Sequence, residues 1–413
     1  MKTKGGATPI LMIWPGVPAW RIDGKLWLDR KFRDGMEASS ARWPGRIRAF
    51  MEVQDMSSMP PFGAWRWGSD QASFDLQVIE PGETLTASDL ADVDVLLATA
   101  DDHRQLEAAA LCERTGTACI YVIEYTLRTR LDMTRHSKAP AWGRAKTAVW
   151  HLCNELRVSR AIRRARGLQA NGIPAWRAYR ASTRSPQLFF DTRFRRDMLV
   201  TPAALDSRLA VLRQGGPIRL AFSGRLIPAK GGDALLPLAL RLSQLGLPFS
   251  LDIYGSGESN EEIRAGIQEH GLTDVVRLHG PVDFDEVLMP TLKERADVFV
   301  CCHRQGDPSC TYAETLGCGV PIAGFGNESL AALVDAHDIG WSVPMGDISG
   351  LAALIVRLAA NREEIASKSL AAMRFAQEHH FESVVDLRMR HCASALPAEV
   401  ADSSYFNNQR STT

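Results

Sequence analysis

Residues 217–232 read PIRLAFSGRLIPAKGG, an apolar run that ends in a glycine-containing turn. The pattern predicts a strand from Pro217 to Ser223 and a helix from Gly231 to Gly246. The glycines allow close backbone approach, the start of the helix offers free N–H groups, and Arg225 and Lys230 add two positive charges. The stretch therefore predicts a phosphate site, with an ordinary glycine-containing turn as the alternative.

The regions around this stretch alternate short apolar runs with helical patterns. In the second half we expect strands at 249–254, 275–278 and 297–302, and helices at 261–270, 284–294, 348–360 and 362–379. The first half shows the alternation less regularly, with strands at 10–14, 93–98 and 118–123 and a helix at 104–114. Such alternation is typical of parallel sheets with right-handed crossovers, so both halves are predicted to be Rossmann-like.

The length of 413 residues is sufficient for two domains. We expect a first domain at 1–200 and a second at 201–375, with the segment 189–216 crossing between them. A terminal helix at 376–396 is expected to cross back. The tail 397–413, rich in Ser, Asn and Thr, is expected to be disordered.

The composition indicates a globular protein. The 48 Lys and Arg residues balance 48 Asp and Glu residues, and 45% of the chain is hydrophobic, which excludes disordered and collagen-like classes. No signal peptide and no apolar run of about 18 residues is evident, so we expect neither secretion nor a membrane span. Eight cysteines without a CxxC pair or a zinc-type spacing favour a reducing cytoplasm and no protein-bound metal.

A second stretch, residues 302–322, reads CHRQGDPSCTYAETLGCGVPI. A strand is expected to end at Cys302, and Pro308 or Ser309 to begin a helix that carries Glu314 and ends at Gly319. Ligands of open parallel sheets bind at the carboxyl edge, where this helix would begin. A carboxylate early in such a helix suits the hydroxyls of a ribose.

The two stretches together resemble the retaining nucleotide-sugar glycosyltransferases of the GT-B fold, family 4, also grouped as glycosyl transferases group 1. The matching elements are SGRLIPAKGG at 223–232, IYGSGE at 253–258, VRLHGPV at 276–282 and DPSCTYAETLGCGVPIAG at 307–324. The resemblance covers residues 217–345 well. It implies an α/β fold of two Rossmann-like domains facing an interdomain cleft, with C-terminal helices packing back toward the first domain.

The resemblance also implies roles for individual residues. Arg225 and Lys230 would hold the donor diphosphate and stabilise it as it leaves, and Glu314 would hold the ribose. The base pocket would lie at the turn 255–258 and the strand end 278–280. The remaining expected donor-binding residues are Gly16, Gly224, Gly255, Ser256, Gly257, Leu278, His279, Gly280, Ser309, Cys310 and Thr311.

The sequence departs from the family pattern at one position. The pattern has an acidic residue eight positions before Glu314, where this chain has Gly306. Asp307 is our candidate to replace that acid in catalysis, and His303 is a further candidate contact for the sugar or phosphate. In the first half, Glu124 follows the strand 118–123 and is our candidate for the acceptor hydroxyl, with a structural role at the strand end as the alternative.

The segment from Arg128 to Arg166 is strongly basic. It holds eleven Lys or Arg residues against Asp132 and Glu155, a net charge of +9 in a neutral chain, with Trp142 and Trp150 at helical spacing. The other apolar residues interleaved with them are Val149, Leu152, Leu156 and Ile162. This pattern favours contact with an anionic membrane or a lipid-diphosphate acceptor, with a solvated basic helix as the alternative. No nucleic-acid module accompanies the charge.

The resemblance implies a hexosyltransferase that uses a UDP-sugar or GDP-sugar with retention and needs neither metal nor cofactor. Its acceptor would be a saccharide or a polyprenyl-diphosphate-linked saccharide, in bacterial exopolysaccharide or cell-surface glycan synthesis. We expect it in the cytoplasm, at the inner face of the membrane. A nucleotide-sugar epimerase of the same fold and a nucleotide-sugar-binding protein that has lost catalysis are the alternatives.

Overall fold

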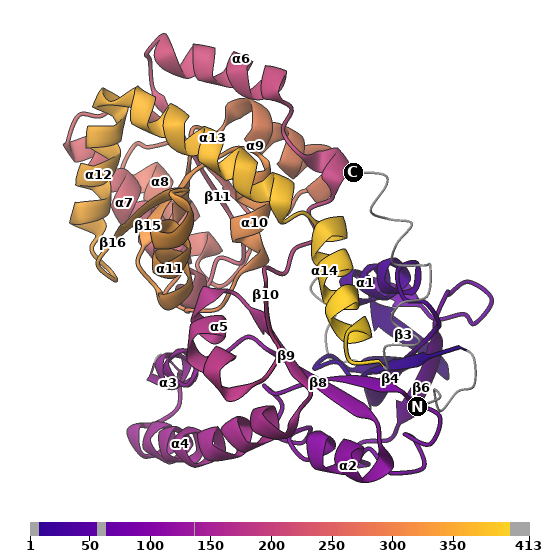
Figure 1. Cartoon of the computed structure of the whole chain (residues 1–413). Helices are drawn as coiled ribbons and strands as arrows, with labels where there is room; N and C mark the ends of the chain where they lie inside the picture. Colours follow the sequence, from indigo (N-terminus) through magenta and orange to yellow (C-terminus); the bar gives the residue numbers. More distant parts are fainter. Residues whose placement is uncertain (1–7, 56–62, 136, 397–413) are drawn as a thin grey trace.

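The computed structural model describes residues 8–55, 63–135 and 137–396 and shows two sheets, each at the centre of its own domain (Figure 1). The first sheet has ten strands, in the order β10-β9-β8-β7-β1-β4-β2-β3-β5 with β6 paired to β4. The second has six, in the order β13-β12-β11-β14-β15-β16. The predicted disordered tail at 397–413 lies outside the described residues.

The second domain follows the predicted alternation closely. All the strand pairs of its sheet are parallel. Its strands are β11 (Ile218–Ser223), β12 (Phe249–Tyr254), β13 (Val276–Gly280), β14 (Val298–Cys301), β15 (Ile322–Phe325) and β16 (Gly340–Val343). Its helices are α6 (Pro202–Arg213), α7 (Gly232–Gln244), α8 (Asn260–Glu269), α9 (Met289–Arg295), α10 (Cys310–Gly317), α11 (Glu328–His337), α12 (Ile348–Ala360) and α13 (Arg362–Glu378). The expected helix at 284–294 is split, because a π-helical turn at Phe284–Leu288 precedes α9.

The first domain has a parallel core with an antiparallel extension. The core strands are β1 (Ile10–Ile13), β4 (Arg46–Asp55), β6 (Asp75–Ile79), β7 (Val95–Thr99), β8 (Ala118–Ile123), β9 (Gly167–Asn171) and β10 (Pro186–Phe189). The extension consists of β2 (Ala19–Ile22), β3 (Lys25–Asp29) and β5 (Ala64–Arg66). The helices are α1 (Arg30–Ser40), α2 (Ala108–Thr115), α3 (Leu127–Arg135), α4 (Ala141–Arg164) and α5 (Ile173–Tyr179).

The antiparallel extension was missed in the sequence, although a local signal for it exists. Asp23 and Gly24 connect β2 to β3, and their φ angles are 49° and 70°. A two-residue hairpin turn of type I′ requires positive φ at both positions, and Asp-Gly satisfies this at low cost. The pair therefore forms a hairpin turn.

The C-terminal helices pack back onto the first domain, as the resemblance implied. After α13 the chain continues into α14 (Phe381–Ala393), which contacts α1 and β10 (yellow in Figure 1). The contact includes a reciprocal pair of hydrogen bonds. The buried Gln169 on β9 donates from Nε2 to Arg388 O over 3.0 Å and accepts at Oε1 from Arg388 Nε over 2.8 Å. This polar pair fixes the position of α14 on the sheet edge.

Arg208 on α6 connects the C-terminal ends of α9 and α10 through hydrogen bonds to their backbone carbonyl groups. Its guanidinium is buried and donates to Lys293 O at 3.1 Å, to Cys318 O at 2.8 Å and to Gly319 O. Burial lowers the pKa of Arg208 to about 10, so the group still carries its charge at neutral pH. The charge is compensated by backbone carbonyls at the ends of α9 and α10.

We predict that Arg208→Met destabilises the protein by about 2 to 4 kcal/mol, because it leaves several buried carbonyl groups without a donor. The free energy of unfolding in urea measures this loss. The control is Arg213→Met on the same helix, where the side chain is exposed and paired with Glu363. Its unfolding midpoint should stay close to that of the wild type, and equal losses in both variants would contradict the assignment.

Candidate functional site

The loop after β11 is fixed against the loop after β14. Gly231 has a φ of 72°, and a Cβ atom there would lie 2.1 Å from Cys302 O, so only glycine fits. Ala229 O accepts hydrogen bonds from the backbone N–H groups of Arg304 and Gln305 at 3.0 and 3.2 Å. The two sequence stretches that carry the resemblance therefore lie side by side at the carboxyl edge of the sheet.

Lys230 is buried at this edge. Its Nζ lies 2.8 and 3.0 Å from the two carboxylate oxygens of Asp307. Arg225, in contrast, is exposed and acts electrostatically across the cleft on Tyr125 of the first domain. Burial raises the pKa of the Tyr125 hydroxyl, and the Arg225 charge opposes that shift. Lys230 and Arg225 thus belong to one loop. The Lys230 side chain is buried, whereas the Arg225 side chain is exposed toward the first domain.

The glycine-rich turn after β12 packs against the same loop. A Cβ atom on Gly255 would lie 2.0 Å from Gly224 O, and one on Gly257 would lie 2.4 Å from Leu226 O. The Ser256 carbonyl accepts from Leu226 N at 2.9 Å. The predicted donor-binding residues Gly224, Gly255, Ser256 and Gly257 are therefore brought together by close backbone contact.

The strand end 278–280 presents mainly backbone to this region. The His279 ring stacks on Tyr254 with centroids 4.6 Å apart, and its Nε2 lies 2.7 Å from Asp252 Oδ1. The Leu278 side chain packs on the core of the second domain. Gly280 O accepts from Gly255 N at 2.8 Å. The His279 and Leu278 side chains are thus occupied by the sheet.

Glu314 is buried on α10, and its Oε1 accepts a hydrogen bond from Arg193 Nε at 2.9 Å. The Arg193 guanidinium also lies over the Phe284 ring, 3.5 Å from its centroid. Arg193 belongs to the segment between the domains, and the sequence analysis did not single it out. A ligand of Glu314 would share the carboxylate with this arginine.

The start of α10 faces the first domain. Ser309 is its N-cap residue, and Cys310 and Thr311 begin the helix, where backbone N–H groups are free to bind anions. Lys31 on α1 reaches this point, with its Nζ 2.9 Å from Cys310 Sγ and 2.6 Å from Asp191 Oδ2. A cation of the first domain therefore lies beside the N-terminus of α10.

Glu124 directly follows β8, at the carboxyl edge of the first sheet. Its Oε1 accepts from Asn171 Nδ2 at 3.2 Å, and Asn171 Oδ1 accepts from Asp191 N at 3.0 Å. Burial, together with the charges of Asp191 and Asp101, raises the pKa of Glu124 from 4.5 to about 7. A carboxyl group with this pKa can give or take a proton near neutral pH.

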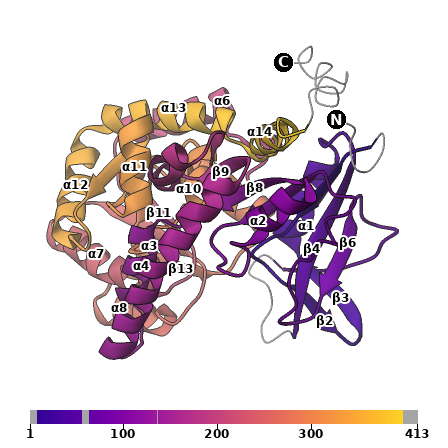
Figure 2. The same ribbon diagram turned by 60° about the horizontal axis from the view of Figure 1, so that its bottom comes forward.

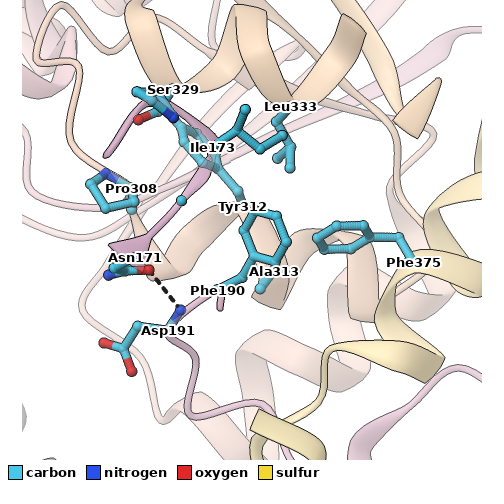
Figure 3. A pocket seen from close by; sticks show the side chains of 13 residues that line it. Asn171, Ile173, Phe190, Asp191, Pro308, Tyr312, Ala313, Ser329, Leu333 and Phe375 are labelled. Atoms are coloured by element: carbon cyan, nitrogen blue, oxygen red, sulfur yellow. Dashed lines mark hydrogen bonds between the residues drawn. The ribbon is translucent and has the colours of Figure 1, made fainter. Parts of the chain in front are cut away.

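An apolar crevice between the domains adjoins this cluster (Figure 3). Ile173 and Phe190 line it from the first domain and the crossing segment, and Tyr312, Leu333 and Phe375 from the second domain. Asn171 and Asp191 lie at its rim, and the Asp191 carboxylate points away from the apolar side chains (Figure 3). The polar cluster is thus placed where the two domains meet.

The space beside Gly306 is filled by Glu328 of the same domain and by Thr129 of the first domain. A Cβ atom on Gly306 would lie 3.2 Å from Glu328 Cβ and 3.3 Å from Thr129 Oγ1. The Glu328 carboxylate accepts from the hydroxyls of Thr126 at 2.7 Å and Thr129 at 2.8 Å. An acidic side chain at position 306 would therefore displace this interdomain contact, which gives a physical reason for glycine there.

His303 and Gly16 are two further residues for which the sequence predicted a role. His303 is buried beneath the loop 223–232, with its ring near those of Phe222 and Tyr312. Burial, together with the Lys230 charge, lowers its pKa, so the ring is neutral. Gly16 is exposed after β1, where a Cβ atom would lie 3.6 Å from Thr99 Cγ2. Among the described residues, no group of three His, Cys, Asp or Glu side chains is arranged to hold a metal ion.

The basic segment forms two helices, α3 and α4, that contact each other beside the cleft (Figure 2). Arg130 belongs to the interior, donating to Tyr125 O at 2.8 Å and Tyr179 OH at 3.0 Å, and Ile162 lies in the core. The outer face of α4 is unusually apolar. Of the twelve large exposed apolar side chains in the described residues, five lie on it, namely Trp142, Val149, Trp150, Leu152 and Leu156.

The second domain matches the family model described as "Glycosyl transferases group 1" over residues 207–373. Two curated proteins are similar in sequence. The amylovoran biosynthesis glycosyltransferase AmsK of Erwinia amylovora is 26% identical over 168 residues, which is 38% of this chain. The 2-deoxystreptamine glucosyltransferase of Streptomyces kanamyceticus is 25% identical over 154 residues, which is 37% of this chain. In both cases the match spans only 39% of the relative's own length.

Solved structures extend the likeness to both domains. HepE of Anabaena, in complex with UDP, superposes with a TM-score of 0.64 at 14% identity and covers 94% of this chain and 100% of its own. The lipopolysaccharide outer core galactosyltransferase WaaB superposes with a TM-score of 0.61 at 12% identity, with the same coverage. At these identities the likeness shows the fold alone, and it confirms the GT-B arrangement of two Rossmann-like domains.

We predict that Glu124→Gln is more favourable for stability, relative to the wild type, at pH 8 than at pH 4.5. The folded state binds the Glu124 proton more tightly than the unfolded state, so wild-type stability falls as pH rises from 4.5 toward 7. Glutamine has no such proton and keeps the acceptor for Asn171. The stability of the variant relative to wild type should rise by about 2 to 3 kcal/mol between these pH values.

Thermal and urea unfolding at both pH values measure the difference. Glu262→Gln, which removes an exposed carboxylate on α8, is the control and should show no pH-dependent gain. Glutamine is chosen at position 124 because an Ile or Val side chain there would also remove the hydrogen bond from Asn171. A pH-independent effect of Glu124→Gln would show that the carboxyl group has an ordinary pKa.

Proposed function

We propose that this protein is a retaining, metal-independent glycosyltransferase of family 4 that transfers a hexose from a UDP-sugar or GDP-sugar. The observation that carries the proposal is the meeting of Lys230, Arg225 and the N-terminus of α10 at one sheet edge, with Glu314 in the same helix. Two cations and a helix N-terminus suit a diphosphate. They would also stabilise the charge that develops on the diphosphate as it leaves.

The Lys230–Asp307 pair gives donor binding a defined electrostatic effect. In the described structure the Asp307 carboxylate balances the Lys230 charge at 2.8 Å. A bound diphosphate would compete with Asp307 for the ammonium group, since both are anions. Asp307 would then turn toward the hydroxyls of the transferred sugar, the role for which the sequence made it a candidate.

The catalytic step that we propose is a front-face displacement. Retaining enzymes that act through a covalent intermediate place two carboxyl groups about 5 to 5.5 Å apart across the sugar. Here Asp307 is paired with Lys230, and Glu124 belongs to the opposite domain. We therefore assign the acceptor proton to the leaving diphosphate and the orientation of the acceptor hydroxyl to Glu124.

The acceptor is proposed to be a saccharide or a lipid-linked saccharide of a bacterial exopolysaccharide or cell-surface glycan. The name of the Erwinia relative, which refers to amylovoran biosynthesis, supports this class. No helix among the described residues is both long and apolar enough to cross a membrane. We propose that the protein works in the cytoplasm, where its free cysteines stay reduced, and contacts the membrane through α4.

We predict that Arg225→Ala weakens donor binding about tenfold or more, because it removes a charge-assisted hydrogen bond of about 1.5 to 3 kcal/mol. Calorimetry with several UDP-sugars and GDP-sugars gives the dissociation constants. The exposed Arg241 on α7 provides the control, since Arg241→Ala removes the same charge from the same domain. Unchanged donor binding by Arg225→Ala would exclude its contact with the diphosphate.

Product analysis separates the proposed activity from its alternatives. Conversion of the donor to another nucleotide sugar without acceptor would identify an epimerase. Donor binding without any turnover, over a range of saccharide and lipid-linked acceptors, would identify a binding protein. Transfer with retained anomeric configuration is the expected result.

We predict that the protein sediments with anionic vesicles and not with neutral ones. Trp142 on the outer face of α4 is 73% exposed, and about 1 kcal/mol per engaged basic residue is sufficient for reversible binding. Added salt should release the protein, because charges are screened beyond about 10 Å at 0.1 M. Replacing Arg157, Arg160, Arg163 and Arg164 by Glu should abolish sedimentation. Equal sedimentation with both kinds of vesicle would refute an electrostatic contact.

A further inference from the structure

The second sheet carries polar side chains on one face of β11, β12 and β13, where a parallel sheet usually carries apolar ones. Strands that are buried on both faces read as nearly continuous apolar runs. These three strands read IRLAFS, FSLDIY and VRLHG, in which polar and apolar residues largely alternate. Leu220, Leu251 and Val276 belong to the apolar set and pack in the core with α7 and α12. The alternation therefore indicates that helices leave part of the opposite face uncovered.

Four polar side chains lie on this opposite face. Arg219 is paired with Ser250, and Asp252 is paired with Arg277. Paired residues of neighbouring strands point to the same face, and so do residues two apart on one strand, such as Ser250 and Asp252. Arg219, Ser250 and Arg277 are each the second residue of their strand. These three residues are therefore at the amino ends of the strands, whereas the predicted donor site lies at the carboxyl edge.

The four side chains line one side of a groove of about 1170 Å³ that is open to solvent. The other sides are formed by α6 and α9, which contact each other. Ser207 and Val211 line the groove from α6, and Pro290 and Lys293 line it from α9. Pockets for small molecules usually enclose about 300 to 1000 Å³, so the groove is large enough for such a ligand.

The groove carries more positive than negative charge. Five of its lining side chains are cations, and two, Asp252 and Glu294, are carboxylates. The Asp252 carboxylate is already shared, because its Oδ1 lies 2.7 Å from His279 Nε2 and 3.9 Å from Arg277 Nη1. Lys293 is half-buried, and no carboxylate of the described residues lies within ion-pair distance of its ammonium group. Lys293 is therefore available to an added anion.

Arg208 adds a buried positive charge at the wall of this groove. It is 3% exposed, and no carboxylate in the described part of the chain forms an ion pair with it. Its Nη atoms donate to backbone carbonyls, whereas its buried Nε has no hydrogen-bond partner among the described residues. A buried charge without a counter-charge is costly, and burial accordingly lowers the pKa of Arg208 to about 10. An anion in the groove would reduce that cost.

We propose that the groove is a second anion site, separate from the donor site, and that its ligand is a small molecule with two or more linked phosphate groups. Arg277 from the sheet and Lys293 from α9 bind the phosphate oxygens, and the Ser250 hydroxyl donates to them. Cations from several elements around one space favour a compact multivalent anion over an extended acidic chain. The groove lies at the other end of the strands from the donor loops, so its ligand binds together with the donor rather than in its place.

Calorimetry with inorganic triphosphate tests the groove. The measurement uses the Arg225→Ala/Lys230→Gln protein, in which the donor loop has lost its two cations. This protein should bind triphosphate about tenfold more tightly than inorganic phosphate, or better, because only the longer anion reaches several cations. Adding Arg277→Gln/Lys293→Gln should weaken triphosphate binding about tenfold or more. Val211→Glu, which adds a carboxylate on the α6 side and removes no cation, should weaken it as well.

ATP, compared with inorganic triphosphate on the same proteins, identifies the source of the phosphate groups. Tighter binding of ATP that the groove variants lose would identify a nucleotide as the ligand. Equal or weaker binding of ATP would identify a polyphosphate without a base.

Arg241→Gln/Arg264→Gln is the matched control, since it removes the same charge from exposed positions of α7 and α8 on the other side of the sheet. It should leave triphosphate binding unchanged. Absence of triphosphate binding, or an equal loss in the groove and control variants, would overturn the proposal. In otherwise wild-type protein, the groove substitutions should leave the affinity for UDP-sugars and GDP-sugars unchanged. A loss of that affinity would show that the groove belongs to the donor site and is no second site.

Discussion

Parallel strand pairing is the constraint on which the site of this protein depends. In a parallel sheet every strand ends at the same edge, so the loops that follow the strands are neighbours whatever their distance in sequence. In the second domain this brings the loop with Lys230 against the loop with Asp307. In the first domain it brings Glu124 at the end of β8 beside Asn171 at the end of β9. The two edges then face each other.

The contact between the two edges is made by polar groups around an apolar crevice. Lys31 reaches Cys310, and the hydroxyls of Thr126 and Thr129 reach Glu328. Each of these hydrogen bonds joins a first-domain residue to the second domain close to a predicted ligand. Any relative movement of the domains must therefore change the surroundings of the predicted donor and acceptor positions together, and domain closure of this kind can couple ligand binding to catalysis.

Buried charges in the site are paired, as the cost of isolating a charge from water requires. Lys230 is paired with Asp307, and Glu314 with Arg193. A diphosphate or a ribose would join these pairs as a third member. Glu124 is different, because burial, together with the charges of Asp191 and Asp101, raises its pKa. The pairs suit the binding of anions and hydroxyls, whereas Glu124 suits a hydrogen bond that orients a hydroxyl group.

The alternation of the second domain and the two loops at the carboxyl edge of its sheet could be predicted from the sequence, because local periodicity and glycine placement are visible within about ten residues. The Asp23-Gly24 pair is a further local signal, since both residues have positive φ in the hairpin turn. The pairing of Arg193 with Glu314, 121 residues away, and the filling of the space at Gly306 by Glu328 and Thr129 are visible in the folded structure alone. Such contacts leave no periodic trace, because they depend on how two folded domains meet rather than on the residues next to them in the chain.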